Sequence, residues 1–277
     1  MKIIFDLGAN HGQNLNYFLK KADVVIAVEA NPKLVTKIKS NFKKFIDDKR
    51  LIIENVVLIN DNKIKKIDFF LSKGNGLTST LFPKNPNKFF KQKIKCEKTS
   101  LLVMRYLSVF DIKNIEYIKI DLEGADHLIL DDLIKNNIFP KYLSVECHRP
   151  EIIELLINSK YKSFKFVQGG NMLFKKNVKI KIKNGDREIV NFDKHSSGPY
   201  GDDIPGPYYD KSSIFPFFLN NGLGWKDIHC SADEKINLQN IKYLPSTHSS
   251  GFRHHLRNIL PSLIKALKYK ISIIKNK

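Results

Sequence analysis

Short apolar runs alternate with stretches of helical periodicity along the first two thirds of the chain. The runs at 2–7, 24–29 and 116–121 contain few polar residues, as expected for strands buried on both faces of a parallel sheet. Between them, residues 32–46 place Leu34, Ile38 and Phe42 on one side of a helix. The alternation predicts an α/β fold with a mostly parallel sheet and helices on both faces.

The same patterns predict the order of the elements. We expect strands at 2–7, 24–29, 51–54, 116–121 and 142–148, and helices at about 13–21, 32–46, 101–110, 125–135 and 150–159. Further strands are expected at 64–72 and 93–98. Residues 161–167 and 171–174 fit a closing antiparallel hairpin with the Gly-Gly-Asn segment at 169–171 as its turn.

The first expected strand runs directly into a Gly-rich turn, DLGANHG (residues 6–12). Such a turn before a helix brings backbone N–H groups close to a ligand. Asp6 can take a cationic or hydroxyl-bearing group, while Gly8 and Gly12 let a nucleoside approach the main chain around Asn10. The spacing is not the G-x-G-x-x-G of dinucleotide sites. We therefore expect S-adenosylmethionine here, with a plain tight connection as the structural alternative.

A second acid stands at the end of the second expected strand. Glu29 follows the apolar run 24–28 and precedes Pro32, which suits the first turn of a helix. In nucleoside-binding α/β folds, an acid about 20 residues past the Gly-rich turn binds ribose hydroxyls. We expect that role for Glu29. The alternative is a solvated carboxylate at a strand end.

A third motif, YIKIDLEGAD (residues 117–126), ends another buried strand in two carboxylates around a glycine. The segments FDLGANHG, IAVEANP and IKIDLEGAD, in this order and spacing, resemble the FkbM family of S-adenosylmethionine-dependent methyltransferases. The resemblance covers about residues 3–175. It implies a Rossmann-like class I methyltransferase fold with a seven-stranded sheet, and O-methylation of hydroxyls on sugars, glycans or polyketide-like natural products.

The resemblance also implies roles for residues outside these motifs. Asn55 follows the third strand, where methyltransferases often contact the adenine amine; a turn-forming Asn is the alternative. Thr78 and Ser79 lie in a polar Gly-rich loop (74–80) that relatives place near the active site, although a plain surface loop has the same composition. Relatives commonly carry a Leu-Asp pair near position 100, whereas this chain has the apolar sequence LLV at 101–103.

Methyl transfer to a hydroxyl requires a group that removes the acceptor proton. Asp121 ends the fourth strand, and Glu146 and His148 end the fifth with a spacing that directs both to one face. His148 is our candidate base because an imidazole titrates near neutral pH; a histidine capping the helix that follows Pro150 is the alternative. Asp121 could take the same proton or orient the donor. A divalent ion on these three side chains is not favoured, because no compact metal motif is present.

Composition and charge limit the partners and the cellular location that we expect. The 277 residues carry a formal charge of +19, which fits a lysine-coated surface, an anionic substrate or an anionic membrane. No nucleic-acid motif is present, so nucleic acid is not an expected partner. Three scattered cysteines, no signal peptide and no apolar run long enough to span a bilayer predict a cytoplasmic enzyme.

The C-terminal third differs in character. Residues 195–209 are rich in Gly, Pro, aromatics and acids, which favours a loop beside a ligand. We expect Tyr200, Asp202, Asp203 and Trp225 to bind a sugar acceptor through ring faces and hydroxyl hydrogen bonds. The expected division is a methyltransferase domain at 1–183, a C-terminal extension at 184–250 with acceptor-site loops, and a basic tail at 251–277.

Residues 253–277 carry seven Lys or Arg and no acid, with apolar residues at helical spacing. This pattern is typical of an amphipathic helix on the inner face of an anionic membrane, although Pro261 interrupts it. A helix packed on its own domain, or a partly disordered tail, is the alternative. The sequence does not predict the oligomeric state.

The function that these features favour is O-methylation of a saccharide or glycan precursor. The same fold could instead methylate a small natural product or an amine. A non-catalytic nucleoside-binding or membrane-associated protein is the third hypothesis, and the complete set Asp6, Gly8, Gly12, Glu29 and Asp121 argues against it.

Overall fold

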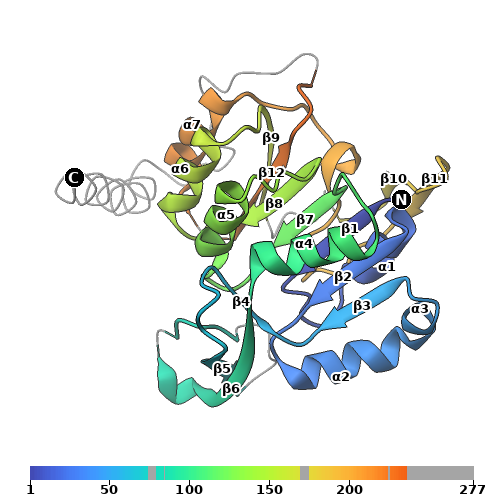
Figure 1. Ribbon diagram of the computed structural model, residues 1–277. Coiled ribbons are helices and arrows are strands. Elements are labelled where there is room, and N and C mark those ends of the chain that lie inside the picture. Colours follow the sequence, from blue (N-terminus) through green and yellow to red (C-terminus); the bar gives the residue numbers. More distant parts are fainter. Residues whose placement is uncertain (74–78, 84, 169–174, 224, 236–277) are drawn as a thin grey trace.

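A sheet of seven strands forms the centre of the protein, in the order β3-β2-β1-β7-β8-β12-β9 (Figure 1). The computed structural model describes residues 1–73, 79–83, 85–168, 175–223 and 225–235. The sheet strands are β1 (Ile3–Leu7), β2 (Val24–Val28), β3 (Leu51–Glu54), β7 (Tyr117–Ile120), β8 (Tyr142–Glu146), β9 (Ser163–Gln168) and β12 (Lys226–Ser231). The first five pair in parallel, and β12 is antiparallel to both its neighbours. The predicted α/β fold is confirmed.

Helices cover both faces of the sheet. They are α1 (Leu15–Lys21), α2 (Pro32–Asn41), α3 (Lys43–Asp47), α4 (Thr99–Val109), α5 (Asp126–Lys135), α6 (Pro150–Asn158) and α7 (Ile214–Asn221). Side chains of α4, α5, α6 and α7 pack with Phe5 and Ile118 on one face, whereas α1 and α2 pack with Ile4 and Tyr117 on the other. The long helix predicted at 32–46 is two helices, because the chain bends at Phe42.

The strand between β8 and β9 comes from a segment in which we expected none. We predicted that 161–167 would pair with 171–174; the latter lie outside the described residues, and β9 pairs with β12. Ile228 and Cys230 of β12 join the main core, while Asp227 and His229 alternate with them and face the other side of the sheet. Residues after 184 therefore supply part of the central sheet.

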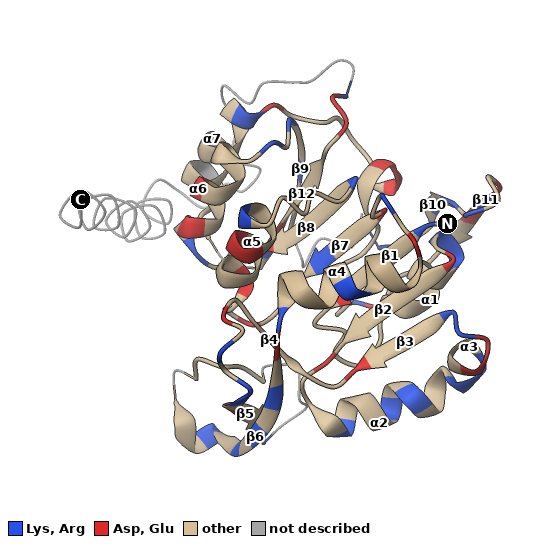
Figure 2. Ribbon diagram, in the orientation of Figure 1, with Lys and Arg blue, Asp and Glu red and all other residues tan. Residues whose placement is uncertain are grey.

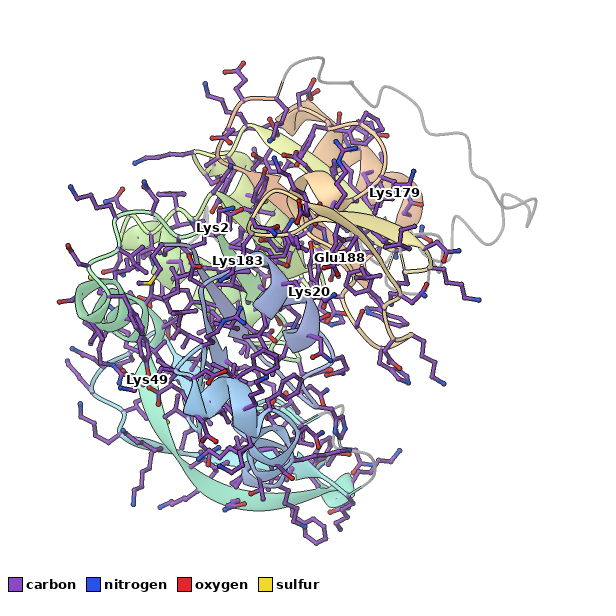
Figure 3. All side chains as sticks on the ribbon, turned by 90° about the vertical axis from the view of Figure 1, so that its right-hand side faces the viewer. Lys2, Lys20, Lys49, Lys179, Lys183 and Glu188 are labelled. Atoms are coloured by element: carbon purple, nitrogen blue, oxygen red, sulfur yellow. The ribbon has the colours of Figure 1, made fainter. Side chains whose placement is uncertain are left out.

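A short hairpin, β10 (Val178–Lys181) and β11 (Arg187–Val190), packs beside α1. Figure 3 labels Lys20 and Glu188 close together, and these two side chains form an ion pair. Lys183 pairs with Asp23 at 3.1 Å next to them. These contacts attach the hairpin to the amino-terminal side of the sheet.

A second, smaller sheet stands beside the carboxyl ends of the central strands (Figure 1). It contains β4 (Val57–Ile59), β5 (Lys66–Ser72) and β6 (Phe89–Lys98), in the order β4-β6-β5. The strand predicted at 93–98 is thus the end of a ten-residue strand that pairs with β5 up to Lys95 and with β4 from Cys96 onward. We call the described residues from Lys63 to Lys98 the arm.

Several of the predicted features lie outside the described residues: Thr78, the strand at 171–174 with its turn, and the basic tail at 251–277. Among the described helices, none combines the length and the apolar character needed to cross a bilayer.

Candidate active site

A cavity of about 240 Å³ opens at the carboxyl ends of β1, β2, β7 and β8. In open α/β sheets this edge is where ligands bind. Eight of the residues predicted from the sequence line the cavity: Gly8, Asn10, Glu29, Ser79, Asp121, Glu146, His148 and Trp225. The three sequence motifs therefore meet in one place.

The turn after β1 forms one side of the cavity. At Gly8 the main chain has a φ of +92°, and a β-carbon there would lie 1.9 Å from the main-chain oxygen of Asp121. Only glycine permits this approach. Asn10 also has a positive φ, and its side-chain oxygen is buried without a hydrogen-bond partner among the described residues. The turn thus presents main chain and a polar atom to a ligand.

Glu29 faces this turn from the end of β2. Its two carboxylate oxygens accept the backbone N–H groups of Asn10 at 2.8 Å and of Asn31 at 2.7 Å. Burial raises the pKa of Glu29 to about 7, even though these N–H groups favour the charged form. Each oxygen keeps a lone pair for a ligand hydroxyl, as the predicted ribose role requires.

A buried lysine holds the two strand-end acids together. The ammonium of Lys119 lies 3.3 Å from Oδ1 of Asp6 and 3.2 Å from Oδ2 of Asp121, and donates to the carbonyl of Gly8 at 3.0 Å. Burial alone would lower the pKa of Lys119, but the charges of Asp121 and Asp6 raise it above its usual value. Asp6 is fully buried, so it reaches the cavity only through Lys119.

The candidate base is paired with a carboxyl group. Nε2 of His148 lies 2.8 Å from Oε2 of Glu146. Burial, together with the charges of Asp121 and Asp227, raises the pKa of Glu146 well above its usual value. His148 keeps about a third of its side chain exposed at the cavity. A buried carboxyl group that orients a partly exposed imidazole is an arrangement suited to proton transfer.

Two further acids surround this pair. Glu123 lines the cavity beside Asp121, and its burial and the charge of Asp121 raise its pKa to about 7. Asp227, the second residue of β12, lies opposite Glu146 in the sheet, and burial raises its pKa to about 7. Sequence analysis missed Asp227 because β12 was not predicted. The alternation of residues 227–231, with Ile228 and Cys230 apolar, was the available signal.

The opposite end of the cavity carries aromatic and imidazole rings. Trp225 and His195 line it, and Trp225 is 49% exposed. The buried ammonium of Lys175 lies 5.1 Å from the centre of the Trp225 ring and donates to the carbonyl of Lys194. The indole is thus held from one side while the other remains available to a ligand.

Three predicted acceptor residues do not reach the cavity. Tyr200 is buried and stacks on Tyr117, the first residue of β7, with ring centres 4.0 Å apart. Asp202 accepts the hydroxyl of Tyr142, the first residue of β8, at 2.7 Å. These contacts hold the loop at the amino ends of the strands, opposite the cavity.

Asp203 belongs to the same structural contacts, because its carboxylate accepts the hydroxyl of Tyr17 at 2.7 Å and pairs with Lys21 at 2.6 Å. The prediction that Tyr200, Asp202 and Asp203 contact the acceptor is therefore corrected. The Tyr200 ring is buried, and the two acids accept hydrogen bonds from the hydroxyl groups of Tyr17, Tyr142 and Tyr208.

Two predicted donor residues have structural roles. The amide nitrogen of Asn55 donates to the carbonyls of Glu29 and Ala30 at 2.9 and 3.0 Å, so it holds the turn after β2 and does not line the cavity. At Gly12, a β-carbon would meet Leu15 and Phe42 at 3.0 and 3.1 Å. Gly12 therefore lets α1 and α2 pack closely.

The described residues contain no group of three or more His, Cys, Asp or Glu arranged to hold a metal ion. Asp121 is paired with Lys119 at 3.2 Å, and Glu146 is paired with His148 at 2.8 Å. A cation at that place would compete with the ammonium.

The solved structures that match this chain include the methyltransferase FkbM from Methylobacillus flagellatus. It is 14% identical, and the match covers 60% of this chain and 39% of that chain at a TM-score of 0.39. TrmK from M. capricolum, solved with S-adenosyl-homocysteine, is 14% identical over 88% of this chain and 66% of its own, with a TM-score of 0.35. An RNA methyltransferase candidate from Pyrococcus horikoshii is 12% identical over 83% of this chain and 74% of its own, with a TM-score of 0.34.

A comparison with curated protein sequences gives no match. The family model of the methyltransferase FkbM domain matches residues 6–168, a range that contains the Gly-rich turn, Glu29, Asp121, Glu146 and His148. More than half of the chain lies within this match, so the protein belongs to the FkbM methyltransferase family.

Proposed function

We propose that this protein is an S-adenosylmethionine-dependent O-methyltransferase that acts on a hydroxyl of a saccharide or glycan precursor. The observation that carries the proposal is the pair formed by His148 and Glu146 at 2.8 Å, in the same cavity as the Gly-rich turn and Glu29. A proton acceptor and a nucleoside-binding edge thus face one space.

The turn fits a nucleoside donor on two observations. Gly8 and Ala9 line the cavity, and the side-chain oxygen of Asn10 is buried without a partner in the described structure. Glu29 would accept the ribose hydroxyls. When bound, S-adenosylmethionine supplies a methyl carbon on a positively charged sulfur. Its charge is complementary to the carboxylates of Asp121 and Glu123 at the centre of the cavity.

His148 would remove the proton from the acceptor hydroxyl. Because Nε2 faces Glu146, the ring nitrogen left for the acceptor is Nδ1. A proton arriving at Nδ1 makes the ring cationic when Nε2 keeps its own proton, and the cationic ring at 2.8 Å favours the ionised form of Glu146, whose pKa burial otherwise raises. The carboxylate of Asp121 would orient the donor. The ammonium of Lys119, 3.2 Å away, holds that carboxylate in place.

The charge of the cavity favours a neutral acceptor end. The carboxylate of Asp121 lines it beside Glu123, whose pKa is raised to about 7, and the ammonium of Lys119 is already engaged by Asp6 and Asp121. An anionic group would be repelled from this place. A sugar ring offers neutral hydroxyls and an apolar face, and the exposed face of Trp225 would pack against that face.

The test is methyl transfer from isotope-labelled S-adenosylmethionine to a panel of nucleotide sugars, lipid-linked sugars and free oligosaccharides. We expect label in a methyl ether of a sugar, with S-adenosyl-homocysteine released in equal amount. A matched panel of primary amines and phenolic natural products is the control. Label recovered only on those compounds would contradict the saccharide assignment. Donor binding without transfer to any compound would contradict the enzyme assignment.

A further inference from the structure

The outer part of the arm exposes large apolar side chains. Phe82 is 54% exposed and Phe90 is 59% exposed, and the ammonium of Lys73 lies 5.2 Å from the centre of the Phe90 ring. Next to Phe90, Phe89 is partly exposed. Exposure of phenylalanine rings to water is energetically unfavourable. Soluble monomers seldom gather such rings on a projecting β-ribbon without a binding role.

The same ribbon carries an excess of positive charge. Between Lys63 and Lys98 the sequence has ten lysines, two acids and no arginine. Both acids are engaged by cations, since Asp68 pairs with Lys91 at 2.8 Å and Glu97 with Arg105 at 3.0 Å. Figure 2 shows the lysines as blue segments along β6. Eight of these lysines are described and exposed: Lys63, Lys65, Lys66, Lys73, Lys88, Lys91, Lys93 and Lys95.

The arm is also part of the active-site cavity. Phe69 of β5 and Leu81, next to Phe82, line the cavity, and the hydroxyl of Thr80 donates to the carbonyl of Glu123 at 2.8 Å. The exposed side chains and the cavity are therefore joined by a few residues. A surface that receives the arm would lie close to the opening of the site.

We propose that the arm docks the enzyme on an anionic lipid bilayer, with Phe82 and Phe90 inserted among the lipids and the lysines on the headgroups. Aromatic rings beside lysines suit the boundary between headgroups and hydrocarbon. Attraction of lysines to anionic lipid needs no fixed geometry, whereas recognition of individual phosphates favours the planar fork of arginine, which the arm lacks. The inference goes beyond the proposed methyl transfer and does not depend on the acceptor.

The test is sedimentation of the full-length protein with vesicles of phosphatidylcholine containing about 30% phosphatidylglycerol, without donor or acceptor. We expect binding to these vesicles and much weaker binding to pure phosphatidylcholine. The double variant Phe82→Ser/Phe90→Ser should lower the partition coefficient roughly 10-fold or more, because two rings lose their apolar contact. The variant Lys88→Gln/Lys93→Gln/Lys95→Gln should lower it by a similar factor that shrinks at high salt.

Matched controls separate the arm from the rest of the surface. Ile189→Ser changes an equally exposed apolar residue on β11, and Lys37→Gln/Lys39→Gln/Lys179→Gln removes three exposed lysines from α2 and β10. Both controls should bind vesicles as the wild type does. Every variant keeps residues 251–277, so any contribution of the basic tail is constant, and donor affinity by calorimetry should be unchanged.

Three results would overturn the proposal. The wild type could fail to bind the anionic vesicles, the arm variants could bind as well as the wild type, or the controls could weaken binding as much as the arm variants do. A second measurement tests nucleic acid as the alternative partner of the arm. Binding of the same variants to a mixed-sequence single-stranded RNA is followed by fluorescence anisotropy. Arm variants that lose RNA binding but keep vesicle binding would assign the arm to nucleic acid. None of these results bears on methyl transfer.

Discussion

Gly8 and Asp121 touch through their main chains, so that a β-carbon on Gly8 would lie 1.9 Å from the carbonyl oxygen of Asp121. The contact joins the Gly-rich turn of β1 to the end of β7, two motifs that are far apart in the sequence. It fixes the Gly-rich turn and the end of β7 relative to one another at the edge of the cavity. The glycine is therefore required by packing as much as by the ligand.

Gly8→Ala should destabilise the protein by about 4 kcal/mol or more and abolish donor binding, because the clash involves main chain that cannot rotate away. Gly206→Ala is the matched control. Gly206 has the same φ of +92° but no atom within 4 Å of the added carbon. It should cost only the conformational strain of about 1–2 kcal/mol. Denaturant unfolding of both variants checks this, and equal losses would refute the steric explanation.

Lys119→Met should cost about 3–5 kcal/mol, because it leaves the fully buried carboxylate of Asp6 without its cation. Combining it with Asp6→Asn should recover much of that loss, since the buried charge is then removed as well. A double-mutant cycle on the free energy of unfolding measures the coupling. Additive losses would mean that the two groups stabilise the fold independently.

Glu29→Gln should weaken binding of S-adenosylmethionine by about 1.5–3 kcal/mol, as expected for hydrogen bonds to a charged group. Ribose hydroxyls donate to the ionised carboxylate, whose pKa burial raises to about 7. Wild-type affinity should therefore fall as the pH is lowered through 7, by up to about tenfold per pH unit. Calorimetry between pH 5.5 and 8 should show a flatter profile for the variant. Parallel profiles would exclude Glu29 as the titrating group.

His148→Gln should lower methyl transfer by roughly 10²–10⁴-fold, which is the usual contribution of a general base. Donor affinity should stay within about twofold, because the side chain of His148 pairs with Glu146 and not with Glu29 or the Gly-rich turn among the described contacts. Single-turnover rates with the identified acceptor give the comparison. If this variant keeps the turnover of the wild type, His148 is not the base, and Asp121 becomes the candidate.

Asp227→Asn should stabilise the protein at alkaline pH. Burial raises the pKa of Asp227 to about 7, so the folded state binds this proton more tightly than the unfolded state does. Its contribution to stability is present at low pH and is lost as the pH rises from about 4 through about 7. The variant should match the wild type near pH 4 and exceed it by about 1–4 kcal/mol at pH 8. Unfolding curves that coincide at both pH values would contradict this.

The donor side of the cavity could be predicted because parallel strands deliver their ends to one edge of the sheet. Asp121, Glu29 and Glu146 each follow an apolar run, and this local pattern alone places them together. The pairing of Lys119 with Asp6 follows in the same way, since the two residues are register partners on adjacent strands.

The acceptor side could not be predicted from local patterns. Tyr200 and Trp225 have similar surroundings in the sequence, rich in Gly and Pro, yet one is buried against Tyr117 and the other lines the cavity. Which ring is buried depends on the long-range insertion of β12, and polar residues such as Asp227 and His229 conceal that strand in the sequence. Tertiary packing, and not propensity, decides both outcomes.

The place of β12 has a consequence for biosynthesis. The outer edge of β8 and the inner edge of β9 are both complete in the chain long before Lys226–Ser231 is synthesised. Until that segment leaves the ribosome, the nascent polypeptide holds two strand edges whose shared partner does not yet exist. Unpaired edges recruit other strands, so chaperone protection during the last part of translation would govern how much of this enzyme reaches its native state.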